Sequence, residues 1–142
     1  MPHINWLAVL AATVAAFVSG GLWFGPKTFF PVWWRAMGRA ADEKPAAGMN
    51  MGLLFGSTFA AQLAQATALA VLVGLARSAA GAAGFTAVDG ALVGLVVGLG
   101  LSAASSLPHR LFAGHGYTVW LIEVGNDVLN NVLVGAILGG WA

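Results

Sequence analysis

Polar side chains able to bind a proton, a cation or a small polar solute are concentrated in one apolar stretch near the end of the chain. The stretch reads WLIEVGNDVLNNVLVG, residues 120–135, and it contains two acids and three asparagines. Carboxylates exchange protons, and carboxylate and amide oxygens are the ligands that hard cations prefer. A charged side chain at the centre of a bilayer costs about 2.5–3.5 kcal/mol on insertion scales, so acids inside an apolar span indicate a functional site.

These polar residues would share one face of a helix. Because successive helical residues advance by about 100°, the five positions fall within an arc of about 140°. We call them the polar stripe; they are Glu123, Asn126, Asp127, Asn130 and Asn131. The opposite face is apolar. We therefore expect the stripe to face other helices, another subunit or water instead of acyl chains.

A second polar row is predicted on an earlier helix. Its members are spaced i, i+4 and i+7 and so share a face; they are Thr58, Gln62 and Gln65. The two helices would cross the membrane in the same direction. Counting from the helix centres places Thr58 near Glu123, Gln62 level with Asp127, and Gln65 near Asn130. We expect the two rows to form one shared polar interior.

Three interpretations of the polar stripe stay open. In the first, its amides and carboxyls only hold helices together, at about 0.6 kcal/mol per pair. In the second, they line a hydrated path or a binding pocket for a proton, a cation or a small polar solute. In the third, which is catalysis, His109 and His115 join Glu123 and Asp127 around a metal ion.

The sequence contains no motif that would favour catalysis. The spacing of the two histidines from the acids matches no metal-ligand pattern, and His115 lies between two glycines. No glycine-rich phosphate loop, nucleophile elbow or HExxH motif occurs. We therefore assign no catalytic residue and expect neither a metal nor another cofactor.

The composition is that of an integral membrane protein. Of the 142 residues, 59% are apolar and only 8% are charged, whereas a soluble domain carries about a quarter charged residues. The six Lys and Arg residues are dispersed, so we expect no nucleic-acid partner. The opening MPHINW has no Lys or Arg, which predicts a retained membrane helix instead of a cleaved signal peptide.

Four apolar stretches are long enough to cross about 30 Å of hydrocarbon, which needs about 20 residues each. They cover about residues 4–24, 45–76, 85–107 and 117–141. Gly25 and Pro26 would end the first, and Pro108 would end the third. We predict an all-α, integral membrane four-helix bundle that forms a single domain over residues 1–142.

A short amphipathic helix is predicted between the first two spans, over about residues 30–41. One face would carry Phe30, Trp33, Trp34 and Met37, and another would carry Arg35 and Arg39. This pattern is typical of a helix that lies in the headgroup plane.

The basic residues predict the orientation. Five of the six lie in the loops that join the first span to the second and the third span to the fourth, namely Lys27, Arg35, Arg39, Lys44 and Arg110. Only Arg77 lies on the other side. By the positive-inside rule both loops are cytoplasmic, so we expect a multi-pass protein of the bacterial inner membrane with both termini outside.

Small residues recur at every fourth position of the third span. The row, Gly90, Gly94, Gly98, Ser102 and Ser106, allows another helix backbone to approach closely. A weaker row on the first span consists of Ala8, Ala12, Ala16 and Gly20. With two such rows and a polar stripe, we expect either a homo-oligomer or a subunit of a larger membrane complex.

The two ends of the chain carry a family resemblance. Asn5-Trp6 leads an Ala/Val-rich helix, followed by GLWFGP at residues 21–26 and WRAMG at 34–38, and the chain closes with VGAILGGW at 134–141. These segments resemble the domain of unknown function 1761 family of small bacterial multi-pass membrane proteins. The resemblance spans essentially the whole chain. It implies a four-helix membrane protein and no activity.

We therefore predict an uncharacterised membrane protein that binds or passes a small polar solute, a cation or a proton along the polar stripe. Asp127 and Glu123 would be the titratable groups. The coordinating groups would be Asn126, Asn130, Asn131, Gln62, Gln65 and Thr58. The alternative is a non-catalytic accessory or scaffold subunit of a larger membrane complex.

Overall fold

The computed structural model describes residues 3–81 and 84–141, and within these ranges the regular structure is helical throughout. The elements are α1 (Trp6–Trp23), α2 (Phe30–Ala36), α3 (Met51–Ala80), α4 (Ala87–Val97), the π-helical segment η2 (Gly98–Ala103), α5 (Ala104–Phe112) and α6 (Gly116–Gly140). The segments α4, η2 and α5 join into one span, Ala87–Phe112. With α1, α3 and α6 this gives four helices that are long and apolar enough to cross a membrane.

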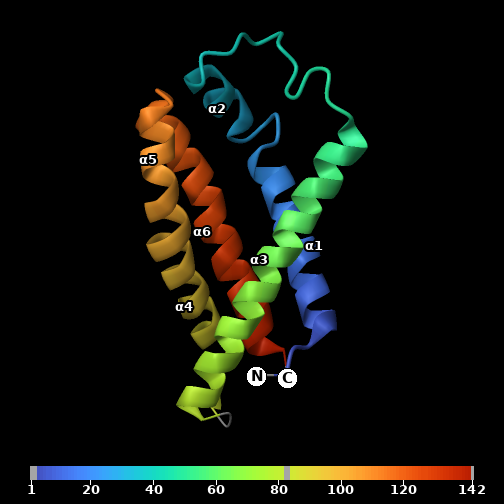
Figure 1. Cartoon of the computed structure of the whole chain (residues 1–142), viewed down its shortest axis with the longest axis vertical. Helices are drawn as coiled ribbons and strands as arrows, with labels where there is room; N and C mark the ends of the chain where they lie inside the picture. The colour runs from blue at the N-terminus through green and yellow to red at the C-terminus, as the bar shows by residue number, and fades with distance from the viewer. Residues whose placement is uncertain (1–2, 82–83, 142) are drawn as a thin grey trace.

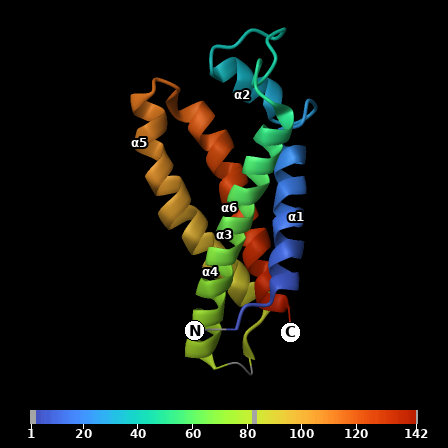
Figure 2. The same ribbon diagram turned by 45° about the vertical axis from the view of Figure 1, so that its right-hand side comes forward.

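The four spans lie side by side, with both termini at one end of the molecule and α2 at the other (Figure 1). The turn between α5 and α6 lies at the same end as α2 in both views (Figures 1 and 2). The prediction of an all-α four-helix architecture with a short helix between the first two spans is confirmed.

The core lies between α1, α3 and α6 and is built from small and branched apolar residues. It includes Ala8, Ala12 and Ala16 of α1, Leu69 and Val73 of α3, and Val134 and Leu138 of α6. Large apolar side chains elsewhere face outward: Leu7, Leu53 and Val96 are 66%, 69% and 71% exposed. An outer surface of this kind suits acyl chains, which cannot satisfy polar groups.

The closest packing in the fold joins α4 to α6. A Cβ atom added to Gly90 would overlap the carbonyl oxygen of Gly135, and one added to Gly94 would overlap the carbonyl oxygen of Asn131. Gly98 also packs on Val128, less closely, because an added Cβ would lie 3.0 Å from the Val128 Cα atom. The row of small residues predicted on the third span therefore meets a helix of its own chain.

The small residues of α1 also point inward. Ala8, Ala12 and Ala16 are each at most 1% exposed, and Gly20 lies against the asparagine amides of α6. Because both rows are used within the chain, association with further copies would need other faces. Oligomer formation stays a prediction.

The start of α3 and the end of α2 differ from the predicted ranges because of local backbone geometry. The span α3 begins at Met51 and not near residue 45, because Ala46 and Gly48 have φ angles of 52° and 83°. Asn50 then caps the helix, and its Oδ1 accepts from the Leu53 amide at 3.0 Å. The helix α2 ends at Ala36, five residues before the predicted end, ahead of Gly38 with φ of 75°.

The prediction that Pro108 ends the third span is wrong. The helix continues through Pro108 to Phe112. Pro108 has no N–H to donate to the preceding turn, where η2 already departs from α-helical geometry. The Ala103 carbonyl in that turn accepts hydrogen bonds from Trp120 Nε1 and Ser106 Oγ, each at 3.2 Å. These side-chain bonds give the Ala103 carbonyl partners in the turn before Pro108.

The glycine contact between α4 and α6 predicts that the free energy of unfolding depends on which glycine is replaced by alanine. Replacing Gly94 by Ala should lower the free energy of unfolding by about 1–3 kcal/mol, because the added methyl group forces the two backbones apart. The measurement is reversible unfolding of the purified protein in detergent. Gly56→Ala is the matched control, since no atom lies within 4 Å of the added Cβ on α3. Equal stabilities for the two variants would contradict the contact.

Candidate functional site

The polar stripe lies on α6 beside the face that α4 covers. Since the backbone of α6 at Asn131 and Gly135 is pressed against α4, the stripe is turned toward α1, α3 and the α2 end of the molecule. The stripe divides into three parts along the helix axis: Glu123, the group Asn126, Asp127 and Asn130, and Asn131.

At the α2 end, Glu123 is held by two other segments. Its Oε2 atom accepts a hydrogen bond and ion pair from Arg110 Nε at 2.5 Å. Its Oε1 atom accepts from Trp33 Nε1 at 3.0 Å. The Glu123 side chain is only 16% exposed, and His115 Nδ1 lies 3.4 Å from Arg110 Nη1. One carboxylate thus joins α2, α5 and α6.

Toward the end of the bundle that carries both termini, here called the terminal end, Asn131 is fully buried. Its side chain has hydrogen-bond partners on both polar atoms. Its Oδ1 accepts from Gln65 Nε2 at 3.2 Å. Its Nδ2 donates to the Asp127 carbonyl at 2.8 Å and to Ser102 Oγ at 3.5 Å. This amide links α3, η2 and α6. Gln65 was predicted to lie near Asn130, and it bonds to the next residue of α6, Asn131.

Between these ends the amides of Asn126 and Asn130 face α1. Asn130 Nδ2 donates to Asn126 Oδ1 at 3.4 Å, and both amides would lie 3.9 Å from a Cβ placed on Gly20. Asn130 is 5% exposed, yet its Oδ1 is buried and accepts no hydrogen bond from a described residue. A buried amide oxygen without a partner is uncommon in native proteins.

Asp127 is the acid at the centre of the stripe. It is half-buried, and its carboxylate takes part in none of the hydrogen bonds or ion pairs found within residues 3–81 and 84–141. The neighbouring acid, Glu123, is one turn away on the same face. Asp127 therefore combines an accessible carboxylate with an interior position in the fold.

The second polar row meets the stripe over only part of its length. Gln65 reaches Asn131, and Gln62 is half-buried on the same helix. Thr58 is exposed, and its hydroxyl donates to Leu54 O of its own helix at 2.8 Å. The reason is that α3 crosses α6 at an angle and diverges from it toward α2 (Figures 1 and 2). Thr58 therefore does not join Glu123.

The partners of Glu123 were not predicted from the sequence. Arg110 was considered only as one of the basic residues that predict the orientation, and Trp33 only as part of an amphipathic face. Arg110 is the one basic residue between the last two spans, which was a usable signal for its pairing with an acid. Trp23 was also missed: its Nε1 donates to Ile122 O at 2.9 Å, and its ring covers Gly125.

The histidines considered for catalysis lie apart from the centre of the stripe. His109 is exposed, and His115 contacts Arg110. Among the residues that the structure describes, no three His, Asp or Glu side chains are placed to hold a metal ion.

Removing one partner of the Glu123 pair should destabilise the protein more than removing both. Glu123→Leu leaves Arg110 without its carboxylate, and loss of a hydrogen bond to a charged group lowers the free energy of unfolding by about 1.5–3 kcal/mol. The double variant Glu123→Leu with Arg110→Leu should recover part of this loss, because no unpaired charge is left. Thermal unfolding in detergent measures both. A double variant that loses as much stability as the two single variants added together would contradict the interaction between Glu123 and Arg110.

The comparisons with known proteins identify the family. The family model described as "Protein of unknown function (DUF1761)" matches residues 7–139, which is nearly the whole chain. No curated protein and no solved structure matches it. The match agrees with the resemblance carried by the opening residues and the closing helix. The chain belongs to the DUF1761 family of proteins of unknown function.

Proposed function

We propose that this protein binds a proton or a small cation at the centre of the polar stripe and passes it across the membrane. The observation that carries the proposal is the difference between the ends of the stripe and its centre. Glu123 and Asn131 have hydrogen-bond partners on other helices. Asp127 and the Oδ1 atom of Asn130 have none among the described residues.

Polar contacts between helices explain the residues at the ends of the polar stripe, Glu123 and Asn131, but do not explain Asp127 at its centre. An interhelical polar contact contributes about 0.6 kcal/mol, whereas a charged side chain deep in a bilayer costs about 2.5–3.5 kcal/mol. The Asp127 carboxylate makes no hydrogen bond or ion pair with another helix among the described residues that would offset this cost. Asp127 is therefore better explained by a ligand that it binds than by packing.

The chemistry of the central groups fits a proton or a hard cation. A carboxylate and amide oxygens are oxygen ligands, and the set contains no sulfur or imidazole. Asp127 would supply the charge, and the Oδ1 atoms of Asn126 and Asn130 would supply neutral ligands. Gln62 and Gln65 on α3 would extend the set, with Gln65 bonded to Asn131. Glu123, held by Arg110, would mark the end of the path near α2.

Flux through reconstituted protein tests the proposal. Proteoliposomes should pass protons, Na⁺ or K⁺ faster than empty liposomes, as measured with ion-sensitive dyes under an imposed gradient. Asp127→Asn keeps the shape of the side chain and removes the charge. It should lower the flux by about tenfold or more, because a contact to a charged group contributes about 1.5–3 kcal/mol. It should not lower the melting temperature.

The matched control is Asp42→Asn, which removes one carboxylate from the exposed loop after α2 and should leave the flux unchanged. A wild-type flux equal to that of empty liposomes for all three ions would contradict the proposal. So would an Asp127→Asn variant with wild-type flux. In either case, constant co-purification with one larger membrane complex would favour an accessory or scaffold role.

We also infer that the protein lies in a bacterial inner membrane with α2 on the cytoplasmic side. The basic residues Lys27, Arg35, Arg39, Lys44 and Arg110 belong to the end that carries α2 and the α5–α6 turn (Figure 1). Arg77 belongs to the end that carries both termini. This distribution, five against one, supports the orientation through the positive-inside rule.

Cysteine labelling tests this orientation directly, because the chain has no cysteine of its own. Ser78→Cys, exposed at the terminal end of α3, should react with a membrane-impermeant maleimide in intact bacterial cells. Ala41→Cys, exposed in the loop after α2, should react only after the cells are broken. The reverse pattern would place α2 outside.

A further inference from the structure

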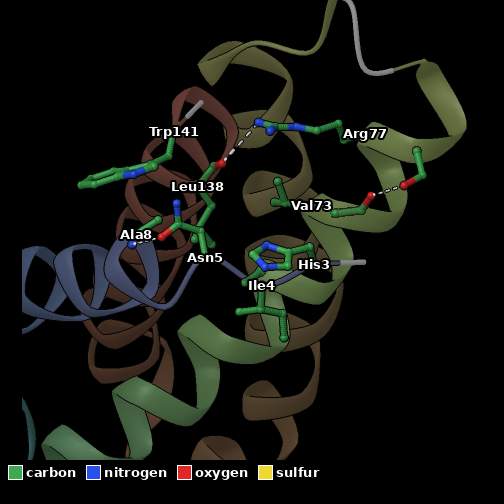
Figure 3. Close-up of a pocket in the computed structure, with 11 residues that line it drawn as sticks. His3, Ile4, Asn5, Ala8, Val73, Arg77, Leu138 and Trp141 are labelled. Carbon is green, nitrogen blue, oxygen red and sulfur yellow. Dashed lines mark hydrogen bonds between the residues drawn. The ribbon is translucent and has the colours of Figure 1, made fainter. Parts of the chain in front are cut away.

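A pocket of about 350 Å³ opens at the terminal end of the bundle, away from Asp127 and Glu123. It is bounded by the start of α1, the last turns of α3 and the end of α6 (Figure 3). Its lining contains the only Lys or Arg residue at this end, Arg77, together with His3 and Asn5. No Asp or Glu is among the residues that line it.

The guanidinium of Arg77 is fixed in place before any ligand arrives. Its Nη2 atom donates to Gly139 O at 2.6 Å and to Leu138 O at 3.5 Å, as Figure 3 shows for Leu138. Its Cζ atom lies 5.3 Å from the centre of the Phe85 ring. A group held on two sides loses little rotamer entropy on binding, and this favours ligand affinity.

Capping α6 uses only part of the donor capacity of Arg77. A guanidinium carries five N–H donors, and among the described residues only Nη2 finds an acceptor. The Nε atom is buried without a partner. Capping of α6 therefore uses only Nη2, and the other N–H donors of the guanidinium have no acceptor among the described residues.

The other pocket residues add donors and an apolar wall. Asn5 Oδ1 accepts from the amides of Leu7 and Ala8 at 3.1 and 3.2 Å, so its Nδ2 remains as a donor. Below Arg77, the side chains of Ile4 and Val73 face the same space (Figure 3). The pocket thus joins a positive, donor-rich side to an apolar side.

We propose that this pocket binds an oxyanion that carries an apolar group, with the phosphate of an alkyl phosphate or of an anionic phospholipid as its chemical form. Arg77 pairs with the phosphate oxygens through its unused donors, as guanidinium groups do. Asn5 and His3 donate further hydrogen bonds. The apolar part lies on Ile4 and Val73. This inference is independent of ion passage through the polar stripe.

Two arms of one experiment separate the soluble source from the lipid source. In the first, octyl phosphate is titrated against the full-length protein in dodecyl maltoside by calorimetry, with octyl glucoside as the uncharged probe. In the second, the protein is held in nanodiscs of phosphatidylcholine and phosphatidylglycerol, and native mass spectrometry measures the lipid that is retained. Saturable binding of octyl phosphate, or selective retention of phosphatidylglycerol, is the expected result.

Arg77→Gln should weaken the binding at least about tenfold, because a charged hydrogen bond is lost. Since this variant also removes a cap from α6, His3→Gln serves as a second variant that leaves the cap intact, and it should weaken binding by a smaller factor. Arg35→Gln, which removes an exposed arginine from α2, should bind as the wild type does. Absence of binding in both arms overturns the proposal, and so does Arg35→Gln losing as much affinity as Arg77→Gln.

Discussion

The backbone contact between α4 and α6 fixes the rest of the structure. Glycines on both helices let carbonyl oxygens and Cα atoms pack directly on one another along Gly90, Gly94, Gly135 and Gly139. Because a helix is rigid, a contact of this length fixes the orientation of α6 about its own axis, and so fixes which of its faces point toward the other helices. That rotation buries Asn130 and Asn131 and leaves Glu123, Asn126 and Asp127 partly buried, away from acyl chains or detergent tails that could not satisfy their polar groups.

The same rotation divides the polar groups of α6 into two kinds. Groups near the ends of the stripe meet fixed partners, Arg110 and Trp33 at Glu123 and Gln65 at Asn131. At its centre, the Asp127 carboxylate and the Oδ1 atom of Asn130 meet none among the described residues. The π-helical segment η2 packs against α6 beside this region, with Gly98 against Val128 and Ser102 beside Asn131, and π-helical segments are frequent at functional sites. Residues at the ends of the stripe bond to other helices, whereas the Asp127 carboxylate at its centre has no such bond among the described residues.

Much of the fold follows from local signals in the chain. Four apolar stretches, the amphipathic segment around α2 and the four-residue spacing of small residues each report a property of neighbouring residues in one helix. Helix ends were less predictable: Ala46 adopts a left-handed φ, and Pro108 lies within a helix. The first is a local backbone conformation, whereas the turn before Pro108 receives a hydrogen bond from Trp120 on α6.

The sequence by itself determined that α6 carries a polar stripe, because helical periodicity needs no knowledge of neighbours. The cost of desolvation then predicts that this stripe turns away from lipid. Only the tertiary structure decided which stripe residues are paired. The crossing angle of α3 brings Gln65 to Asn131 and carries Thr58 away, and the turn after α5 brings Arg110 to Glu123. Those outcomes depend on the relative placement of helices, which no spacing within one helix encodes.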